Sequence, residues 1–142
     1  MGALLHLTKD AEAVNAVVNH PAVRPSCGLV ELGELDFSEV LSRPENLCLM
    51  GEHGGFLLLW SAPRVRELHV FLLPEGRGQW GFNACPEVVD HARAHGAQML
   101  WARIDPAKRH LAMFSRIGGM KPTGEKIETF GVVYDVYCME VH

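Results

Sequence analysis

The first residues in this chain that could do chemistry together lie between Leu68 and Gly81, in the stretch LHVFLLPEGRGQWG. An apolar run ends in Gly76-Arg77-Gly78 and passes directly into a segment with helical spacing. Glycines let a backbone approach a ligand closely, and a helix N-terminus offers free N–H groups and the positive end of its dipole. Arg77 adds a planar cation that suits phosphate oxygens. The unit predicts a phosphate or pyrophosphate site, with an ordinary tight turn and a solvated arginine as the alternative.

Two common phosphate-binding loops do not fit this segment. A P-loop needs Gly-Lys-Ser/Thr, and none follows here. A dinucleotide fingerprint needs a third glycine and an acidic residue at the end of a second parallel strand, and both are missing. If the loop holds a phosphate, it belongs to another class.

The segment resembles motif A of the GNAT acetyltransferases, in which a central strand leads into a Gln/Arg-x-x-Gly-x-Gly/Ala loop and a long helix. Residues 75–80, EGRGQW, occupy that frame, with Glu75 in place of the first Gln or Arg and Trp80 in place of the last small residue. Residues 108–120, KRHLAMFSRIGGM, resemble motif B, in which Phe114 and Gly119-Met120 take matching positions.

A closer resemblance is to a phage-associated GNAT-like group whose loop has the form FLPEGRGxWA, where the tryptophan is expected. Residues 20–25, HPAVRP, and residues 50–60, MGEHGGFLLLW, are similar to the same group. The resemblance therefore covers most of the chain.

What the resemblance implies is a GNAT-like α/β fold in a single domain over residues 1–142. It also implies an N-acetyltransferase that moves an acetyl group from acetyl-CoA, its co-substrate, to an amine by direct attack. The pantetheine would pair with the central strand, the pyrophosphate would meet the loop amides, and the motif B helix would lie beside the thiol. The implied co-substrate contacts are Leu68, Val70, Phe71, Leu72, Gly76, Arg77, Gly78, Gln79, Trp80, Gly81, Lys108 and Phe114.

Such a transfer needs a base, donors for the oxyanion and an acid for the departing thiolate. Glu67 opens the central strand where related enzymes often carry a glutamate, and His69, two residues on, faces the same side of the strand. Either is a candidate base. The usual motif B tyrosine falls on Ser115, so Tyr134, Tyr137 or a water would replace it as the acid, or the activity is altered or absent.

The elements that must position these residues follow from periodicity and turn signals. We expect helices over residues 9–19, 36–41, 79–95 and 106–117, and strands over residues 47–51, 56–60, 65–73, 98–104 and 130–141. His53-Gly54-Gly55 would turn the first strand pair into a hairpin, and a polar connector would precede the last strand. This order predicts an α/β protein with a mixed, mostly antiparallel sheet and flanking helices.

Pro86 lies inside the third of these helices. It removes the hydrogen bond to the Phe82 carbonyl, so we expect a bend between Phe82 and Cys85. A helix that began only at Pro86 would weaken the phosphate-site hypothesis.

Composition bounds the partners. The chain has 142 residues and a net charge of −4, which argues against nucleic acid as the main partner. The opening apolar stretch meets Lys9 and Asp10 too soon for a secretory leader, and no apolar run is long enough for a bilayer. We expect a cytoplasmic protein without a membrane partner, in which the final strand could pair with a second chain to form a homodimer.

Two constellations carry little chemistry. His91 and His95 have metal-compatible spacing but no evident third ligand, so no metal is expected. The four scattered cysteines are expected to be small core residues. Two alternatives to an active acetyltransferase stay open: a GNAT-fold protein that binds acyl-CoA or a protein partner with weak or no catalysis, and a phage accessory protein that keeps the fold alone. The acceptor amine is not indicated.

Overall fold

Seven strands form one sheet in the computed structural model, which describes residues 2–28 and 32–142. The elements in chain order are β1 (His6–Thr8), α1 (Ala11–Val18), η1 (Arg24–Ser26), α2 (Ser38–Ser42), β2 (Leu47–Gly51), β3 (Gly54–Ala62), β4 (Val65–Leu72), η3 (Pro74–Gly76), α3 (Gln79–Ala94), β5 (Met99–Ile104), α4 (Arg109–Ile117), β6 (Lys121–Thr129) and β7 (Val132–Glu140). The strand order is β1-β2-β3-β4-β5-β7-β6, and only β4 and β5 pair in parallel. The predicted α/β class with a mixed, mostly antiparallel sheet is confirmed.

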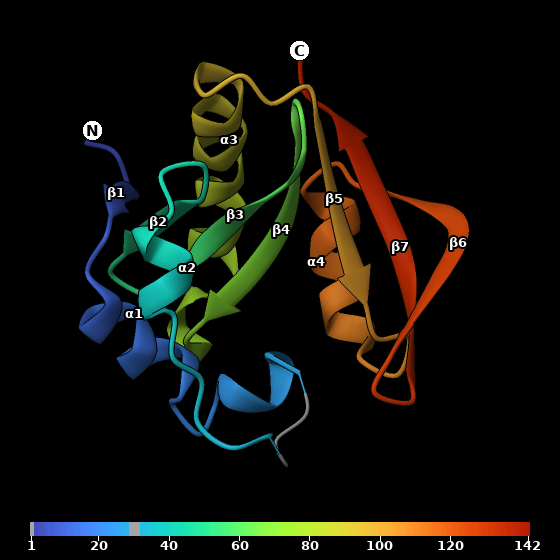
Figure 1. The fold of residues 1–142 in the computed structure, drawn as a ribbon, viewed down its shortest axis with the longest axis horizontal. Helices are drawn as coiled ribbons and strands as arrows, with labels where there is room; N and C mark the ends of the chain where they lie inside the picture. Colours follow the sequence, from blue (N-terminus) through green and yellow to red (C-terminus); the bar gives the residue numbers. More distant parts are fainter. Residues whose placement is uncertain (1, 29–31) are drawn as a thin grey trace.

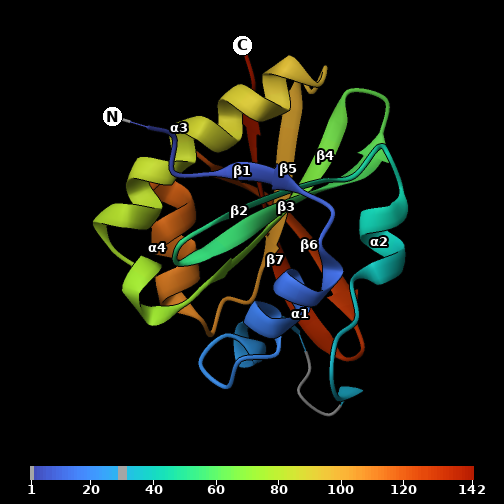
Figure 2. The same cartoon turned by 90° about the vertical axis from the view of Figure 1, so that its left-hand side faces the viewer.

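Helices cover both faces of the sheet (Figures 1 and 2). Val14 and Val18 of α1 pack with Leu41 of α2 on one face, against side chains that include Leu57 and Phe71. On the other face, α3 and α4 pack against the remaining apolar positions, which are Leu49, Phe56, Leu58, Leu72 and Leu100 among others. Successive side chains of β2 to β4 alternate between these two clusters because a strand turns neighbouring residues to opposite faces.

The sheet opens in its middle, between β4 and β5. The two strands pair only at Val65 with Met99, Arg66 with Leu100 and Glu67 with Trp101. Beyond these pairs β4 continues to Leu72 and β5 to Ile104. Figure 1 shows the two strands close together at one end and separating along their length. This divergence leaves the β5-facing edge of β4 without a partner strand from residue 68 onward.

Two strands, β6 and β1, were not predicted from the sequence. The predicted polar connector before the last strand is wrong, because residues 121–129 form β6 and pair with β7 across a turn at Phe130-Gly131. Both turn residues have positive φ, 51° and 79°, as a two-residue hairpin turn requires. The short β1 was not expected either, and it adds a strand to the edge of β2.

The first hairpin turns earlier than predicted. β2 ends at Gly51 and β3 begins at Gly54, so Glu52 and His53 form the turn and the two following glycines lie inside the strand. A Cβ on Gly55 would stand 2.5 Å from the Leu49 carbonyl oxygen. The glycine therefore permits close strand packing rather than the turn itself.

The helices begin near their predicted positions. Asp10 caps α1 by accepting from the Ala13 N–H, and α4 begins at Arg109 rather than at Pro106. α3 begins at Gln79 and runs through Pro86, so it does not start at the proline. The bend near Phe82 stays a prediction. Within the described residues, no helix combines the length and apolarity needed to cross a membrane.

Candidate active site

A groove of about 560 Å³ runs along the open edge of β4, between the start of α3 and the side of α4. Its lining includes Val70 and Leu72 of β4, Phe82 of α3, and Leu111 and Phe114 of α4. The walls are therefore mostly apolar, as small-molecule sites usually are.

The backbone of β4 offers polar groups to this groove. The Arg64 carbonyl accepts from the Met99 N–H at 3.2 Å, and the Leu72 carbonyl accepts from Arg77 Nε at 3.0 Å. Both carbonyls face the β5 side, so the even-numbered residues between them, Leu68 and Val70, turn their N–H and C=O groups to the same edge. Phe71 instead pairs with Gly55 of β3. The backbone of Phe71 therefore pairs with β3 rather than facing the groove, and a contact between Phe71 and the co-substrate stays a prediction.

The loop after β4 contracts into η3 before α3 begins. The Gly76 N–H donates to the Leu73 carbonyl at 2.8 Å, and the Arg77 N–H donates to the Pro74 carbonyl at 3.2 Å. The Phe82 N–H then closes the first turn of α3 on the Gly78 carbonyl. No described side chain caps this helix, whose first N–H groups have no intrahelical partner. The amides from Gly78 to Gly81 are therefore the ones that this loop leaves for an anion.

Two glycines of the loop have opposite surroundings. A Cβ on Gly81 would stand 2.5 Å from the Gly76 carbonyl oxygen and 2.9 Å from the Phe114 ring, so the glycine lets α3 pack against the loop and α4. A Cβ on Gly78 would meet no protein atom within 4 Å. A side chain placed at Gly78 would enter open space beside the helix N-terminus.

Trp80, expected near the co-substrate, packs within the protein. Its ring lies edge-on to His53, with ring centroids 5.3 Å apart, and a Cβ on Gly51 would stand 2.7 Å from it. This packing ties the start of α3 to the β2–β3 turn. A contact between Trp80 and the co-substrate stays a prediction.

The two cations predicted to meet the co-substrate hold a segment of the N-terminal region. Arg77 donates to the carbonyls of Leu72 and Ala22, and the Lys108 ammonium donates to the Pro25 carbonyl. Residues 22–26 thereby lie over the groove, and Val23 and Ser26 line it. A phosphate contact by Arg77 or Lys108 stays a prediction, and it would compete with these carbonyls.

Glu67 lies at the point where β4 and β5 part, and its side chain is buried. One carboxylate oxygen is 2.7 Å from Arg103 Nε, and the other is 3.2 Å from His69 Nε2. Burial alone would raise the pKa of Glu67, but His69 and Arg103 together hold that pKa below its ordinary value of 4.5. An ionised carboxylate with two partners is a weak base near neutral pH.

His69 is better placed than Glu67 to take a proton. As predicted, the two side chains lie on the same side of β4, but the His69 side chain is 41% exposed and lines a second cavity. Its Nε2 lies within ion-pair distance of Glu67 without the alignment of a hydrogen bond. Of the two candidate bases, His69 therefore lies in the cavity wall, and Glu67 lies behind it.

Arg103 was missed as a member of this cluster. Besides Glu67, it contacts Thr129 Oγ1 at 3.0 Å and stacks 5.3 Å from the ring centre of Trp101. A buried carboxylate on a central strand needs a cationic partner. A search of the neighbouring parallel strand for a basic residue could therefore have identified Arg103.

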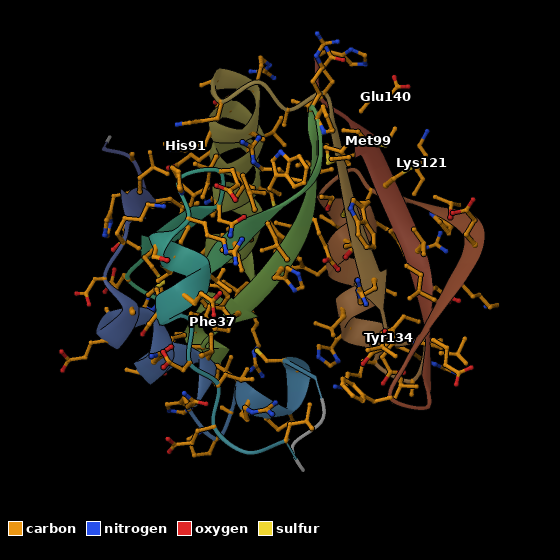
Figure 3. The ribbon with its side chains drawn as sticks, viewed as in Figure 1. Phe37, His91, Met99, Lys121, Tyr134 and Glu140 are labelled. Carbon is orange, nitrogen blue, oxygen red and sulfur yellow. The ribbon has the colours of Figure 1, made fainter. Side chains whose placement is uncertain are left out.

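The second cavity, of about 300 Å³, joins the groove, and Val70, Leu111 and Phe114 line both. Tyr134 lines it together with His69, Arg103 and Ser115. Figure 3 labels Tyr134 near the lower end of β7, toward which β4 and β5 separate.

The other candidate acid, Tyr137, is 4% exposed and packs in the cluster under α3 and α4, 5.7 Å from the Arg116 guanidinium. His69 and Tyr134 thus line one cavity, with Glu67 in contact with His69, whereas Tyr137 does not line that cavity.

Cys27 lines the second cavity, where burial raises its pKa above the ordinary thiol value, whereas Cys48, Cys85 and Cys138 line neither the groove nor the second cavity. Burial raises the pKa of Cys85 to about 11 and that of Cys48 to about 12, so both remain thiols at neutral pH. The rings of His91 and His95 stack on α3, 6.5 Å apart, and no metal-binding cluster occurs among the described residues.

Comparisons with known proteins bear on the fold. Neither a protein-family model nor a curated protein matches the sequence. Solved structures do: a putative acetyltransferase from Salmonella typhimurium with acetyl-CoA is 16% identical, with a TM-score of 0.72 over 100% of this chain and 95% of that one.

Two other structures match in the same way. A putative GNAT-family acetyltransferase from Desulfovibrio desulfuricans is 16% identical, with a TM-score of 0.68 over 97% of this chain and 98% of that one. An aminoglycoside 6'-N-acetyltransferase complexed with coenzyme A is 9% identical, with a TM-score of 0.72 over 97% of both chains. The chain therefore has the fold of the GNAT acetyltransferases, which confirms the predicted GNAT-like fold.

Proposed function

We propose that this protein is an N-acetyltransferase that uses acetyl-CoA as the acetyl donor and a primary amine as the acceptor. The observation that carries the proposal is the open edge of β4 at Leu68 and Val70, which leads directly to the uncapped N-terminus of α3. A ligand with an extended amide chain and a pyrophosphate at its end matches both features in that order. Solved structures with the same fold include some that were determined with acetyl-CoA or coenzyme A.

The groove suits such a donor along its length. The amides of a pantetheine chain can pair with the backbone of Leu68 and Val70 as a neighbouring strand would. The pyrophosphate would meet the N–H groups from Gly78 to Gly81 and the positive end of the α3 dipole. The apolar faces of Leu111 and Phe114 would flank the thioester end, where the groove joins the second cavity.

The transfer itself would take place at that junction. His69 accepts the proton whose loss makes the acceptor nitrogen nucleophilic, directly or through one water. The nitrogen attacks the thioester carbonyl carbon, and as the C–N bond forms and the C–S bond breaks, the second amine proton passes to the sulfur through Tyr134 or a water. Glu67 positions His69, and Arg103 keeps Glu67 ionised.

Calorimetric titration with acetyl-CoA, followed by an assay of thiol release, tests the proposal. Gly78→Glu places a negative charge at the proposed pyrophosphate site without a steric clash, so we expect at least about tenfold weaker binding. Ala94→Glu is the matched control, since it adds the same charge at an exposed position near the other end of α3.

The outcomes separate the hypotheses. Acetyl-CoA binding that Gly78→Glu weakens and Ala94→Glu spares supports the groove. Absence of binding by the wild type would contradict the proposal. Binding without thiol release for any amine would indicate a GNAT-fold protein that holds acyl-CoA without turnover, for which Ser115 at the usual tyrosine position is the motivating feature.

A further inference from the structure

Four phenylalanine or tyrosine rings line the second cavity, against two in the groove. The four are Phe37, Phe71, Phe114 and Tyr134. The apolar part of the wall also includes aliphatic side chains, which are Leu35, Leu68, Val70, Ala102, Ile104 and Leu111. Its volume of about 300 Å³ is at the small end of the range for small-molecule sites.

We infer that the acceptor is a small monoamine with an apolar or aromatic body, and that polyamines and other polycations are poor substrates. The inference rests on the proposed function, because it assigns the second cavity to the amine that receives the acetyl group. It follows from the charges around the cavity as much as from its apolar wall.

The charged side chains that line the cavity are basic. His69 and Arg103 are both in the wall, and no Asp or Glu lines the cavity among the described residues. The nearest carboxylate behind the wall is Glu67, which is 5% exposed and already contacts both of them. A second ammonium group in this cavity would meet Arg103, and no carboxylate of the described residues lines the cavity to neutralise it. An unpaired ammonium is costly to bury.

Four other acids lie next to lining residues in sequence but do not line the cavity themselves: Glu34, Asp36, Asp105 and Asp135. Asp36, between two lining residues, accepts from Asn15 and from Ser38. Asp135 pairs with Lys126 on the neighbouring strand. Asp105 accepts from the Ala107 N–H at 3.0 Å. None of these four carboxylates is part of the cavity wall, so none of them lies where it would neutralise the far end of a polycation inside the cavity.

Arg103 does not favour an acceptor with a carboxylate either. Its Nε donates to Glu67, one of its terminal nitrogens donates to Thr129, and its plane lies against Trp101. The fork that would grip a carboxylate with two parallel hydrogen bonds is therefore occupied on one side. An apolar body without a second charge is the acceptor that this wall accommodates.

A matched pair of amines tests the inference. Hexylamine and hexamethylenediamine have the same chain length and differ by one ammonium group. With the wild-type protein and saturating acetyl-CoA, we expect kcat/KM for hexylamine to exceed that for the diamine by roughly tenfold or more. Equal values, or a preference for the diamine, would overturn the inference.

A substitution at Leu35 changes the wall of the second cavity at a position where the backbone is held by hydrogen bonds. The Leu35 N–H donates to Asn19 Oδ1 at 2.7 Å, and its carbonyl accepts from Asn19 Nδ2 at 2.8 Å, so its side chain has a defined place in the cavity wall. Leu35→Glu should reduce the hexylamine preference by roughly tenfold, because it supplies a carboxylate. Leu32→Glu is the control, since Leu32 is 58% exposed on the same segment and does not line the cavity.

The assay separates this inference from the proposed function. If acetyl-CoA does not bind in the calorimeter, the proposed function fails and the inference falls with it. If acetyl-CoA binds and the protein acetylates other amines but not hexylamine, or acetylates the diamine as efficiently as hexylamine, only the inference fails. A preference that Leu35→Glu diminishes and Leu32→Glu leaves unchanged supports it.

Discussion

The groove along β4 and the second cavity beside it are two halves of one cleft, yet they are built from different groups. In the groove, the backbone of Leu68, Val70 and the first turn of α3 offers polar groups to a ligand, beside the lining side chains of Arg77, Arg109 and His110. In the second cavity polar groups come from side chains on three strands, His69, Arg103 and Tyr134, and the buried carboxylate of Glu67 contacts the first two.

This difference explains how each half tolerates sequence change. Backbone N–H groups do not depend on residue identity, so Glu75 and Trp80 can depart from the usual motif while the loop keeps its shape. Side-chain clusters depend on every member, so replacement of the usual tyrosine by Ser115 changes the acid that the second half can supply. We therefore expect substitutions in the two halves to separate donor binding from turnover.

The largest effect on stability and turnover should follow removal of the Glu67 carboxylate beside the second cavity. Glu67→Ala leaves Arg103 without its partner and should lower the free energy of unfolding by about 2 kcal/mol, measured by urea denaturation. Thiol release at saturating acetyl-CoA should fall by about a hundredfold, as for loss of a group that positions a catalytic base.

Its control is Glu67→Gln, which keeps a hydrogen-bond acceptor for Arg103 and should unfold closer to the wild type. A Glu67→Ala protein with wild-type stability and turnover would refute the role given to this cluster.

At the groove, adding a side-chain atom to a closely packed glycine should lower the stability of the protein. Gly81→Ala forces a Cβ toward the Gly76 carbonyl and the Phe114 ring, and we expect a loss of about 1 to 2 kcal/mol in stability. Gly78→Ala, in open space three residues earlier, should leave the urea midpoint close to the wild-type value. Equal midpoints for the two variants would mean that the loop does not pack as described.

Acid should affect the second half more than the first. The pKa of Glu67 is lower in the folded protein than its ordinary value of 4.5, so the cluster stabilises the fold fully above that value. That contribution disappears as the pH falls through the lowered pKa. Urea midpoints should therefore decline more steeply below pH 4.5 in the wild type than in Glu67→Gln. Parallel declines would show that Glu67 is not the group responsible.

The smallest effect is expected for an exposed ion pair outside both halves. Lys126→Ala removes the partner of Asp135 on the β6–β7 hairpin, where the lysine side chain is 63% exposed. Exposed pairs contribute about 0.5 kcal/mol or less. Denaturation should show a change of that size, and calorimetry should show unchanged acetyl-CoA binding. A large loss of binding would tie the hairpin to the groove.

The two halves were also unequally predictable from sequence. The β4–loop–α3 unit follows from a local apolar run, glycines and helical spacing, and its elements form at the expected positions. The cluster in the second half depends on Arg103, whose partner lies 36 residues away. The contacts of Arg77 with Ala22 and of Lys108 with Pro25 span 55 and 83 residues, which no local pattern encodes.

The missed strand β6 has a similar physical cause. Seven of its nine residues are exposed, so it lacks the apolar alternation by which a half-buried strand is recognised. Pro122 and Gly124 add residues that disfavour strands. Pairing with β7 forms the strand nonetheless, which is tertiary context overriding local preference.

Hydrogen exchange of individual backbone amides, measured by NMR with and without acetyl-CoA, tests the central claim most directly. The claim is that the open edge of β4 and the first turn of α3 hold the acetyl donor. It predicts that acetyl-CoA slows exchange at Val70 and at the amides from Gly78 to Gly81, while the exposed amides of β6 exchange as before. Binding that leaves the Val70 and Gly78–Gly81 amides exchanging at their original rates would contradict it.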